Sequence, residues 1–259
     1  ARGRRVILPA KLDVPRVLGR WGSARSDAPR LLVFAGVHGN EPAGVLAAQQ
    51  VHAALAGGNL AIEGEVVFVA GNRRALARGV RYVDQDLNRS WHQASTPDDR
   101  VSDGVGADVV PAEALERQEI LEVADPALAR AGGPVYALDL HTTSGAGGVF
   151  STTADSIDNR DLAQALPVPL VLGLEELLDG TLHDYLDGRG CITLAFEAGQ
   201  HDDLRSVERA EAAIWLTLAE TGLVSEPAHP EVGAARRLLA RDGLRHPPVL
   251  EMRYRHPVG

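Results

Sequence analysis

The sequence is poor in cysteine, methionine, lysine and aromatic residues. Its 259 residues include a single cysteine, a single methionine and 4% aromatic side chains. One cysteine excludes an intrachain disulfide. Cys191 lies in the apolar stretch CITLAF, which favours a buried thiol in a strand over a nucleophile. Lys11 is the only lysine, so arginine carries almost all of the positive charge.

Long apolar runs and a net positive charge are also missing. No run of about eighteen apolar residues occurs, and no apolar segment follows the basic amino terminus, so neither a membrane span nor a signal peptide is predicted. A formal net charge of -9 argues against a nucleic-acid or anionic-membrane partner. We therefore expect a cytoplasmic protein that has to build any anion site locally.

Short apolar runs alternate with helical segments along most of the chain. This alternation predicts an α/β fold, a doubly wound and mostly parallel mixed sheet flanked by helices. The strands are expected at residues 6–12, 17–21, 31–35, 65–70, 135–140, 168–172, 192–196 and 249–254. The helices are expected at residues 42–56, 113–131 with an interruption near Pro126, 155–165, 182–186, 203–221 and 232–241. Residues 71–110 show no clear periodicity, and residues 96–106 resemble a surface loop.

The first candidate site is the stretch GVHGNEPAG, residues 36–44, which connects an expected strand to an expected helix. Such turns lie at the carboxyl edge of an α/β sheet, where these folds bind ligands. His38 and Glu41 are three residues apart, so an imidazole and a carboxylate could reach one metal ion. Taken alone, the motif is more typical of a solvated histidine and glutamate pair than of a metal site.

Two further strands end in polar residues that bear on this motif. His141 follows an apolar strand in ALDLHTTS, and Glu197 follows another in TLAFEAGQ. Asp139 precedes His141 by two and faces the same side if the strand continues, so a supporting hydrogen bond to the site is expected. The remaining histidines, His183 among them, lie in contexts typical of structural residues, and His201 is a weaker pocket candidate.

A group of arginines supplies a second signal. Residues 72–89 hold five arginines against two aspartates in a protein that is otherwise acidic. This segment is either a solvated basic loop or a cationic pocket, and guanidinium groups bind carboxylates in bidentate fashion. The second interpretation predicts an anionic substrate.

The segments GVHGNE, RYVDQDLNRSW, DLHTTS and FEAGQ occur in this order. Together they resemble the aspartoacylase and succinylglutamate desuccinylase family, which is related to the zinc carboxypeptidases. The resemblance implies one zinc ion bound by His38, Glu41 and His141, with Glu197 as general base and acid. It further implies that Arg81 stabilises the oxyanion and that Asn88 and Arg89 bind the substrate carboxylate.

This resemblance implies a zinc-dependent amidohydrolase that cleaves an N-acyl amino acid or a similar small anionic amide through an activated water molecule. A zinc carboxypeptidase acting on peptides shares the same chemistry and remains an alternative. A non-catalytic metal- or carboxylate-binding module is a third, although such a module needs no general base.

The resemblance also predicts how the chain is divided into domains. We expect residues 1–225 to form the zinc-hydrolase domain and residues 226–259 to be a linker with the incomplete start of a β-rich C-terminal domain. The family has an arginine shortly before the catalytic glutamate that reads the side-chain carboxylate of the substrate. Arg189 is the nearest candidate, at an uncertain spacing.

Overall fold

The computed structural model describes residues 8–254 except 24, 26, 59, 93–109, 130–131, 146–147 and 244–245. Its strands are β1 (Val17–Gly22), β2 (Arg30–Ala35), β3 (Glu65–Ala70), β4 (Val135–Thr143), β5 (Phe150–Thr152), β6 (Leu170–Leu172), β7 (Ile192–Gln200) and β8 (Val249–Glu251). Its α-helices are α1 (Ala43–Gly57), α2 (Arg73–Arg78), α3 (Ala112–Leu128), α4 (Ile157–Gln164), α5 (Leu182–Asp187), α6 (Arg205–Glu220) and α7 (Pro230–Gly243). Short 3-10 turns are η1 (Leu87–Arg89), η2 (Glu175–Leu177) and η3 (Glu226–Ala228).

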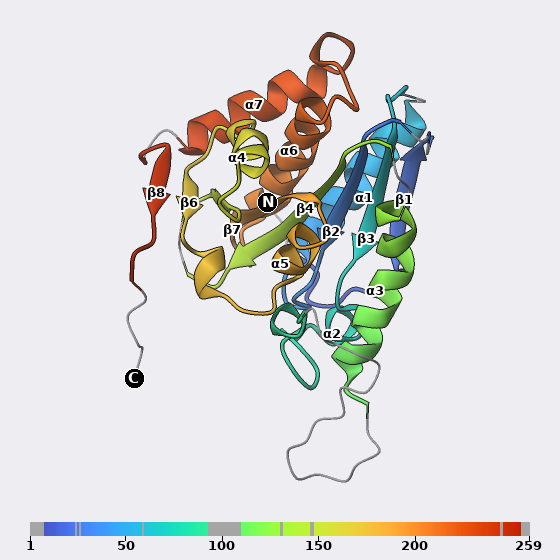
Figure 1. Ribbon diagram of the computed structural model, residues 1–259, viewed down its shortest axis with the longest axis vertical. Helices are drawn as coiled ribbons and strands as arrows, with labels where there is room; N and C mark the ends of the chain where they lie inside the picture. The colour runs from blue at the N-terminus through green and yellow to red at the C-terminus, as the bar shows by residue number, and fades with distance from the viewer. Residues whose placement is uncertain are drawn as a thin grey trace, which may run out of the picture.

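All eight described strands form one sheet in the order β1-β3-β2-β4-β7-β5-β6-β8 (Figure 1). The central strands β3, β2, β4 and β7 are parallel to one another, whereas β1 joins β3 and β5 joins β7 in antiparallel fashion. A mixed, mostly parallel sheet flanked by helices is the architecture that the sequence predicts. The carboxyl ends of the parallel strands therefore meet at one edge of the sheet.

The alternating side chains of the central strands build a separate core on each face. Leu31 and Val33 of β2 pack on one side with α1, α6 and α7, and Leu32 and Phe34 pack on the other with α3 and α5. Figure 1 shows these two helical layers on opposite faces of the sheet. Because both faces are covered, every residue of β2 and β3 is buried. The strands that carry site residues thus have fixed positions.

Several sequence predictions differ from the structure. Residues 8–12 form no strand, and the prediction for residues 6–7 lies outside the described part of the chain, as does the surface loop at residues 96–106. Helix α3 continues through Pro126 and ends at Leu128, and the segment from Gly71 contains α2 and η1. Strands β4 and β7 extend three and four residues further than expected, so His141 and Glu197 lie inside strands and not after them.

The carboxyl-terminal part of the described chain lies against the same body. Helix α7 packs beside α6, and β8 pairs with β6 at the edge of the sheet. Figure 1 shows both elements next to α4 and β6. A domain boundary at residue 225 stays a prediction. Among the described helices, none is long and apolar enough to cross a membrane.

Candidate active site

The loop after β2 holds its two polar side chains inside the protein. His38 is 5% exposed and Glu41 is 2% exposed. The amide of Glu41 donates to the His38 carbonyl, which closes a tight turn, and Gly36 has a φ of 71° that favours glycine. A Cβ on Gly39 would collide with the backbone of Ala75 in α2. The glycines therefore let this loop lie close against α2 with both side chains turned inward.

Strands β4 and β7 bring the next two residues beside this loop. His141 pairs directly with Glu197 in the parallel register of these strands, and Leu140 pairs with Ala35 at the end of β2. Neighbouring strands lie about 5 Å apart. The three strand ends therefore converge, as predicted, on the edge where α/β folds bind ligands.

His38, Glu41 and His141 form the one group of three potential metal-ligating side chains found among the described residues. Their ligand atoms lie within 4.8 Å of one another. The Nδ1 atom of His38 is 2.9 Å from Glu41 Oε1, and the Nδ1 atom of His141 is 3.3 Å from Glu41 Oε2. Two imidazoles and a carboxylate that meet in this way match the His2Glu donor set of catalytic zinc.

The opposite side of each imidazole is held by an aspartate. His38 Nε2 is 3.1 Å from Asp86 Oδ1, and His141 Nε2 is 2.8 Å from Asp139 Oδ2. Carboxylates commonly orient metal-binding histidines in this manner, which leaves the other nitrogen for the ion. The amide of Thr142 also donates to Glu41 Oε2 over 2.8 Å. The residues present therefore fit a divalent metal with both Nδ1 atoms and Glu41 as ligands.

Two carboxyl groups beside this cluster have opposite pKa shifts. Burial acts to raise the pKa of Glu41, but hydrogen bonds from His141 and His38 outweigh it and hold the pKa well below its ordinary value. Burial raises the pKa of Glu197 from 4.5 to about 7, and the nearby histidines only partly oppose this shift. Glu197 Oε2 is buried without a hydrogen-bond partner in the described structure. A carboxyl that titrates near neutral pH is suited to general base and acid catalysis.

The arginine segment reaches the same cleft by way of α2 and η1. Arg81 donates from Nε and Nη2 to Asp86 Oδ2 over 3.1 and 2.9 Å, and its Nη1 lies 3.9 Å from Glu41. Asn88 accepts a hydrogen bond from the Leu182 amide, so its carbonyl oxygen is occupied. Arg81, Asn88 and Arg89 all line one cavity of about 130 Å³ together with the three potential ligands and Glu197. The structure thus brings the predicted metal ligands, Glu197 and the three residues of the arginine segment together around one cavity.

Glu113 supports this segment, and the sequence gives no sign of it. Its carboxylate is fully buried at the start of α3 and accepts hydrogen bonds from the Asn72 side chain and from the amides of Val83, Asp84 and Gln85. In return the Asp84 carboxylate accepts a hydrogen bond from the Ala112 amide. Burial favours the neutral acid, but these hydrogen bonds outweigh it and lower the pKa of Glu113. Asp86, which joins His38 to Arg81, is a second residue whose role only the structure shows.

Two weaker candidates have different surroundings. Arg189 donates to the Tyr185 hydroxyl over 2.7 Å and lies 3.4 Å from Asp125 on the exterior, and it does not line the cavity. The structure therefore does not place Arg189 where it could read a substrate side chain. His201 Nδ1 lies 2.7 Å from the Thr142 hydroxyl at the margin of the site.

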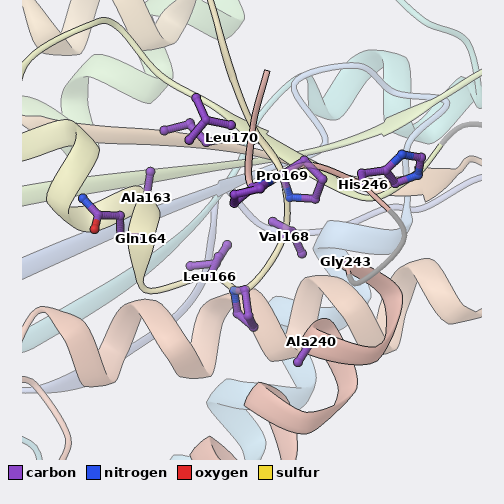
Figure 2. Close-up of a pocket in the computed structure, with 12 residues that line it drawn as sticks. Ala163, Gln164, Leu166, Val168, Pro169, Leu170, Ala240, Gly243 and His246 are labelled. Carbon is purple, nitrogen blue, oxygen red and sulfur yellow. The ribbon is translucent and has the colours of Figure 1, made fainter. Parts of the chain in front are cut away.

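A larger cavity of about 560 Å³ lies elsewhere, among α4, α7 and β8. Figure 2 shows its lining, in which Leu166, Val168, Pro169 and Leu170 supply an apolar wall. His246 is the one titratable residue among the described lining residues, and none of them lines the smaller cavity. The titratable and potential metal-ligating side chains are therefore concentrated around the smaller of the two cavities.

Comparison with known proteins gives consistent findings. The family model of the succinylglutamate desuccinylase/aspartoacylase catalytic domain matches residues 27–219. A succinylglutamate desuccinylase of Pseudomonas paraeruginosa is 37% identical over 94 residues, which cover 36% of this chain and 26% of that protein. The matched region thus spans about a quarter of this curated relative.

Solved structures share the fold. The succinylglutamate desuccinylase of Chromobacterium violaceum superposes with a TM-score of 0.58 at 20% identity, covering 78% of this chain and 65% of that one. A putative metallopeptidase of Shewanella denitrificans superposes with a TM-score of 0.55 at 19% identity, covering 79% of both chains.

Proposed function

The chain belongs to the succinylglutamate desuccinylase/aspartoacylase catalytic domain family, and from this premise we propose that it is a zinc-dependent amidohydrolase acting on an N-acyl amino acid or a similar small anionic amide. The observation that carries the proposal is the direct pairing of His141 with Glu197 beside His38 and Glu41. This pairing places a carboxyl group with a pKa of about 7 next to three potential metal ligands. The desuccinylase names of the matched relatives agree with this class of substrate.

In this proposal His38, Glu41 and His141 hold one zinc ion. When bound there, zinc would polarise the scissile carbonyl and ease the ionisation of a water molecule. Asp86 and Asp139 orient the two imidazoles from behind, so the ligand side chains need little rearrangement. An Asp139→Asn variant is expected to bind zinc about 10- to 100-fold more weakly. Unchanged zinc affinity in this variant would remove Asp139 from the proposed site.

Glu197 moves the proton. Its ionised carboxylate takes a proton from the attacking water as the water oxygen bonds to the amide carbon. It then delivers that proton to the nitrogen as the carbon–nitrogen bond breaks, which releases a carboxylic acid and an amine. A pKa of about 7 suits both steps, because the group can gain and lose the proton near neutral pH.

The arginine segment binds and stabilises negative charge. Arg81 lies beside Glu41 and would meet the charge that develops on the carbonyl oxygen. The carbonyl oxygen of Asn88 is occupied by Leu182, which leaves its amide NH2 group to donate to a substrate carboxylate. The Arg89 guanidinium donates from Nη1 to the backbone carbonyl oxygen of Asn88 and lines the cavity, so Asn88 and Arg89 can together form a carboxylate clamp.

A peptidase is the second candidate, favoured by the fold shared with the Shewanella denitrificans structure. A cavity of about 130 Å³ argues for a small substrate over a peptide. A binding module without catalysis is disfavoured, because a buried carboxyl with a pKa near 7 costs stability and contributes nothing to metal ligation.

The test compares N-acyl amino acids with peptides that carry a free carboxyl terminus. Purified protein is stripped of metal, reloaded with zinc, and assayed for release of free amine. We expect hydrolysis of N-acyl amino acids that is lost on stripping and restored by zinc. Faster cleavage of peptides would favour the peptidase, and no cleavage by the fully loaded protein would favour the binding module.

A further inference from the structure

One side of the catalytic cavity carries buried polar atoms that have no partner within the described structure. These atoms are Asp139 Oδ1, Thr152 Oγ1 and His183 Nε2. Each of the three residues is 3% exposed and lines the cavity. Buried polar atoms are nearly always hydrogen-bonded in native proteins. Their partners must therefore come from water or from a bound molecule.

Four elements build this side, which we call the polar wall and define as Asp139 of β4, Thr152 of β5, Glu175 of η2 and His183 of α5. Thr152 ends β5 and pairs with Ala195 of β7, while His183 lies in the first turn of α5. The helix start is fixed, because the Thr181 side chain caps it and the Leu182 amide bonds Asn88. The polar wall is therefore as firmly positioned as the carboxylate clamp to which it is joined.

The charges along the polar wall disfavour an anion. His183 Nδ1 lies 3.6 Å from Glu175 Oε2, so the positive charge of the imidazole is matched by a carboxylate. Burial alone would raise the pKa of Glu175, but His183 outweighs it and the pKa is lowered. Asp139 adds a second carboxylate, already paired with His141. A substrate carboxylate placed here would meet two like charges and one cation that is already engaged.

Apart from the zinc ion that the proposed function places on His38, Glu41 and His141, the cations of the cavity are also nearly all committed. Arg81 is paired with Asp86, and the two histidines would be neutral when they bind the ion. Arg189, the nearest candidate for reading a second carboxylate, lies outside the cavity. Arg89 thus stands as the guanidinium available for one substrate carboxylate among the described lining residues.

We propose that the polar wall is a subsite in which Thr152 and His183 hydrogen-bond a neutral polar group of the substrate, such as a carboxamide or hydroxyl. The substrate then carries one carboxylate, held by Asn88 and Arg89, and no second one. This inference rests on the proposed function and narrows it, because a succinyl or glutamyl substrate brings the extra carboxylate that the polar wall repels.

Two isosteric substrate pairs test the inference and locate the group. N-acetylglutamine is compared with N-acetylglutamate, which varies the amino-acid side chain. An N-succinamyl amino acid is compared with its N-succinyl counterpart, which varies the acyl group. We expect the neutral member of at least one pair to have a kcat/KM about tenfold higher or more, the cost of about one pKa unit of charge repulsion.

Two variants distinguish the polar wall from general structure. Thr152→Val keeps the shape and removes the hydroxyl, so kcat/KM for the favoured neutral substrate should fall about 3- to 10-fold with little change for the carboxylate member. Glu175→Gln removes a like charge, so the carboxylate member should gain relative to the neutral one. Thr153→Val is the matched control, since the Thr153 hydroxyl bonds the Thr193 carbonyl and does not line the cavity.

Calorimetric binding of glutamine and glutamate as products gives a second measurement that does not depend on turnover. Tighter glutamine binding that Thr152→Val weakens and Thr153→Val leaves unchanged would support the subsite. A wild-type preference for the carboxylate members, or equal losses for both members in Thr152→Val, would overturn it. Absence of hydrolysis across all four substrates would overturn the proposed function, whereas the binding preference for glutamine over glutamate would still support or overturn the subsite.

Discussion

The two sides of the candidate active-site cavity differ in how many of their polar atoms already have a hydrogen-bond or ion-pair partner. On the ligand side, both nitrogens of His38 and of His141 and both oxygens of Glu41 face a partner within the protein. On the polar wall, Thr152 and His183 have atoms without one among the described residues. A side whose polar atoms all have partners keeps its geometry before a ligand binds. A side with unpartnered polar atoms gains its remaining hydrogen bonds from the ligand. In the proposed function the first would determine which chemistry is possible and the second which molecule is the substrate.

The largest expected effect comes from Glu197, which stands between the two sides. Glu197→Gln keeps the shape but cannot accept the proton, so kcat should fall about 1000-fold, within the range for general base catalysis. Zinc affinity should stay nearly unchanged, because Glu197 is not among the proposed ligands. Steady-state kinetics and metal titration measure the two quantities. Glu211→Gln is the matched control, since burial also raises the pKa of that carboxyl, which lies on α6. A loss of activity below about tenfold would contradict the assignment.

Glu197 should also destabilise the metal-free protein above neutral pH. Its pKa is about 7 in the folded state against an ordinary 4.5, so the folded state binds the proton more tightly. The free energy of unfolding therefore falls as pH rises from about 4.5 to about 7, by about 3 kcal/mol in total from this group. Glu197→Gln lacks this loss, so its stability advantage over wild type should be greatest above pH 7. Denaturant unfolding of both proteins at pH 5 and pH 8 tests this, and an equal difference at both values would refute it.

Arg81 lies beside the ligand side, with its Nη1 atom 3.9 Å from Glu41 Oε1. Arg81→Ala should lower kcat about 100-fold, the lower end of the range for loss of an oxyanion donor. Arg81→Lys keeps the charge but not the two-pronged contact with Asp86, so a smaller loss is expected. If KM rises while kcat is unchanged in the alanine variant, Arg81 binds the substrate and does not stabilise the transition state.

The smallest effect is expected at Glu113, which acts through other residues. Glu113→Gln presents an NH2 group to a set of backbone N–H donors, so residues 83–85 should shift and move Arg81 and Asp86. We expect kcat to fall about tenfold, as for a modest misplacement of catalytic groups. The Arg81→Ala background separates positioning from folding: there Glu113→Gln should cost much less activity. Equal losses in both backgrounds would indicate a purely structural role.

Sequence patterns were sufficient for the central sheet and for the residues at its edge. The apolar runs of β2 and β3 have strand length and turn at glycines, and His38, His141 and Glu197 stand at or near the ends of such runs. Their side chains converge because parallel strands share one edge. For these residues, the position at the end of an apolar run in the sequence is enough to predict the position at the edge of the sheet.

The remaining features depend on contacts between distant segments. Glu113 reads as an ordinary acidic residue in a helical first turn, and only the folded chain places residues 83–85 around it. His183 has the local context of a structural histidine, and only the folded chain places it 3.6 Å from Glu175 and on the same cavity as Thr152 of β5. Strand β5 has three residues, too few for a periodic signal.

The close approach of Gly39 to α2 has a further consequence. The Gly39 amide donates to the Arg81 carbonyl over 3.1 Å, so the loop that carries His38 and Glu41 is bonded directly to the residue proposed to meet the oxyanion. Anything that restrains the loop with His38 and Glu41 therefore also restrains the segment that carries Arg81. By thermodynamic linkage, an ion that fixes the loop makes Arg81 easier to place, and a substrate that engages Arg81 tightens the hold on the ion.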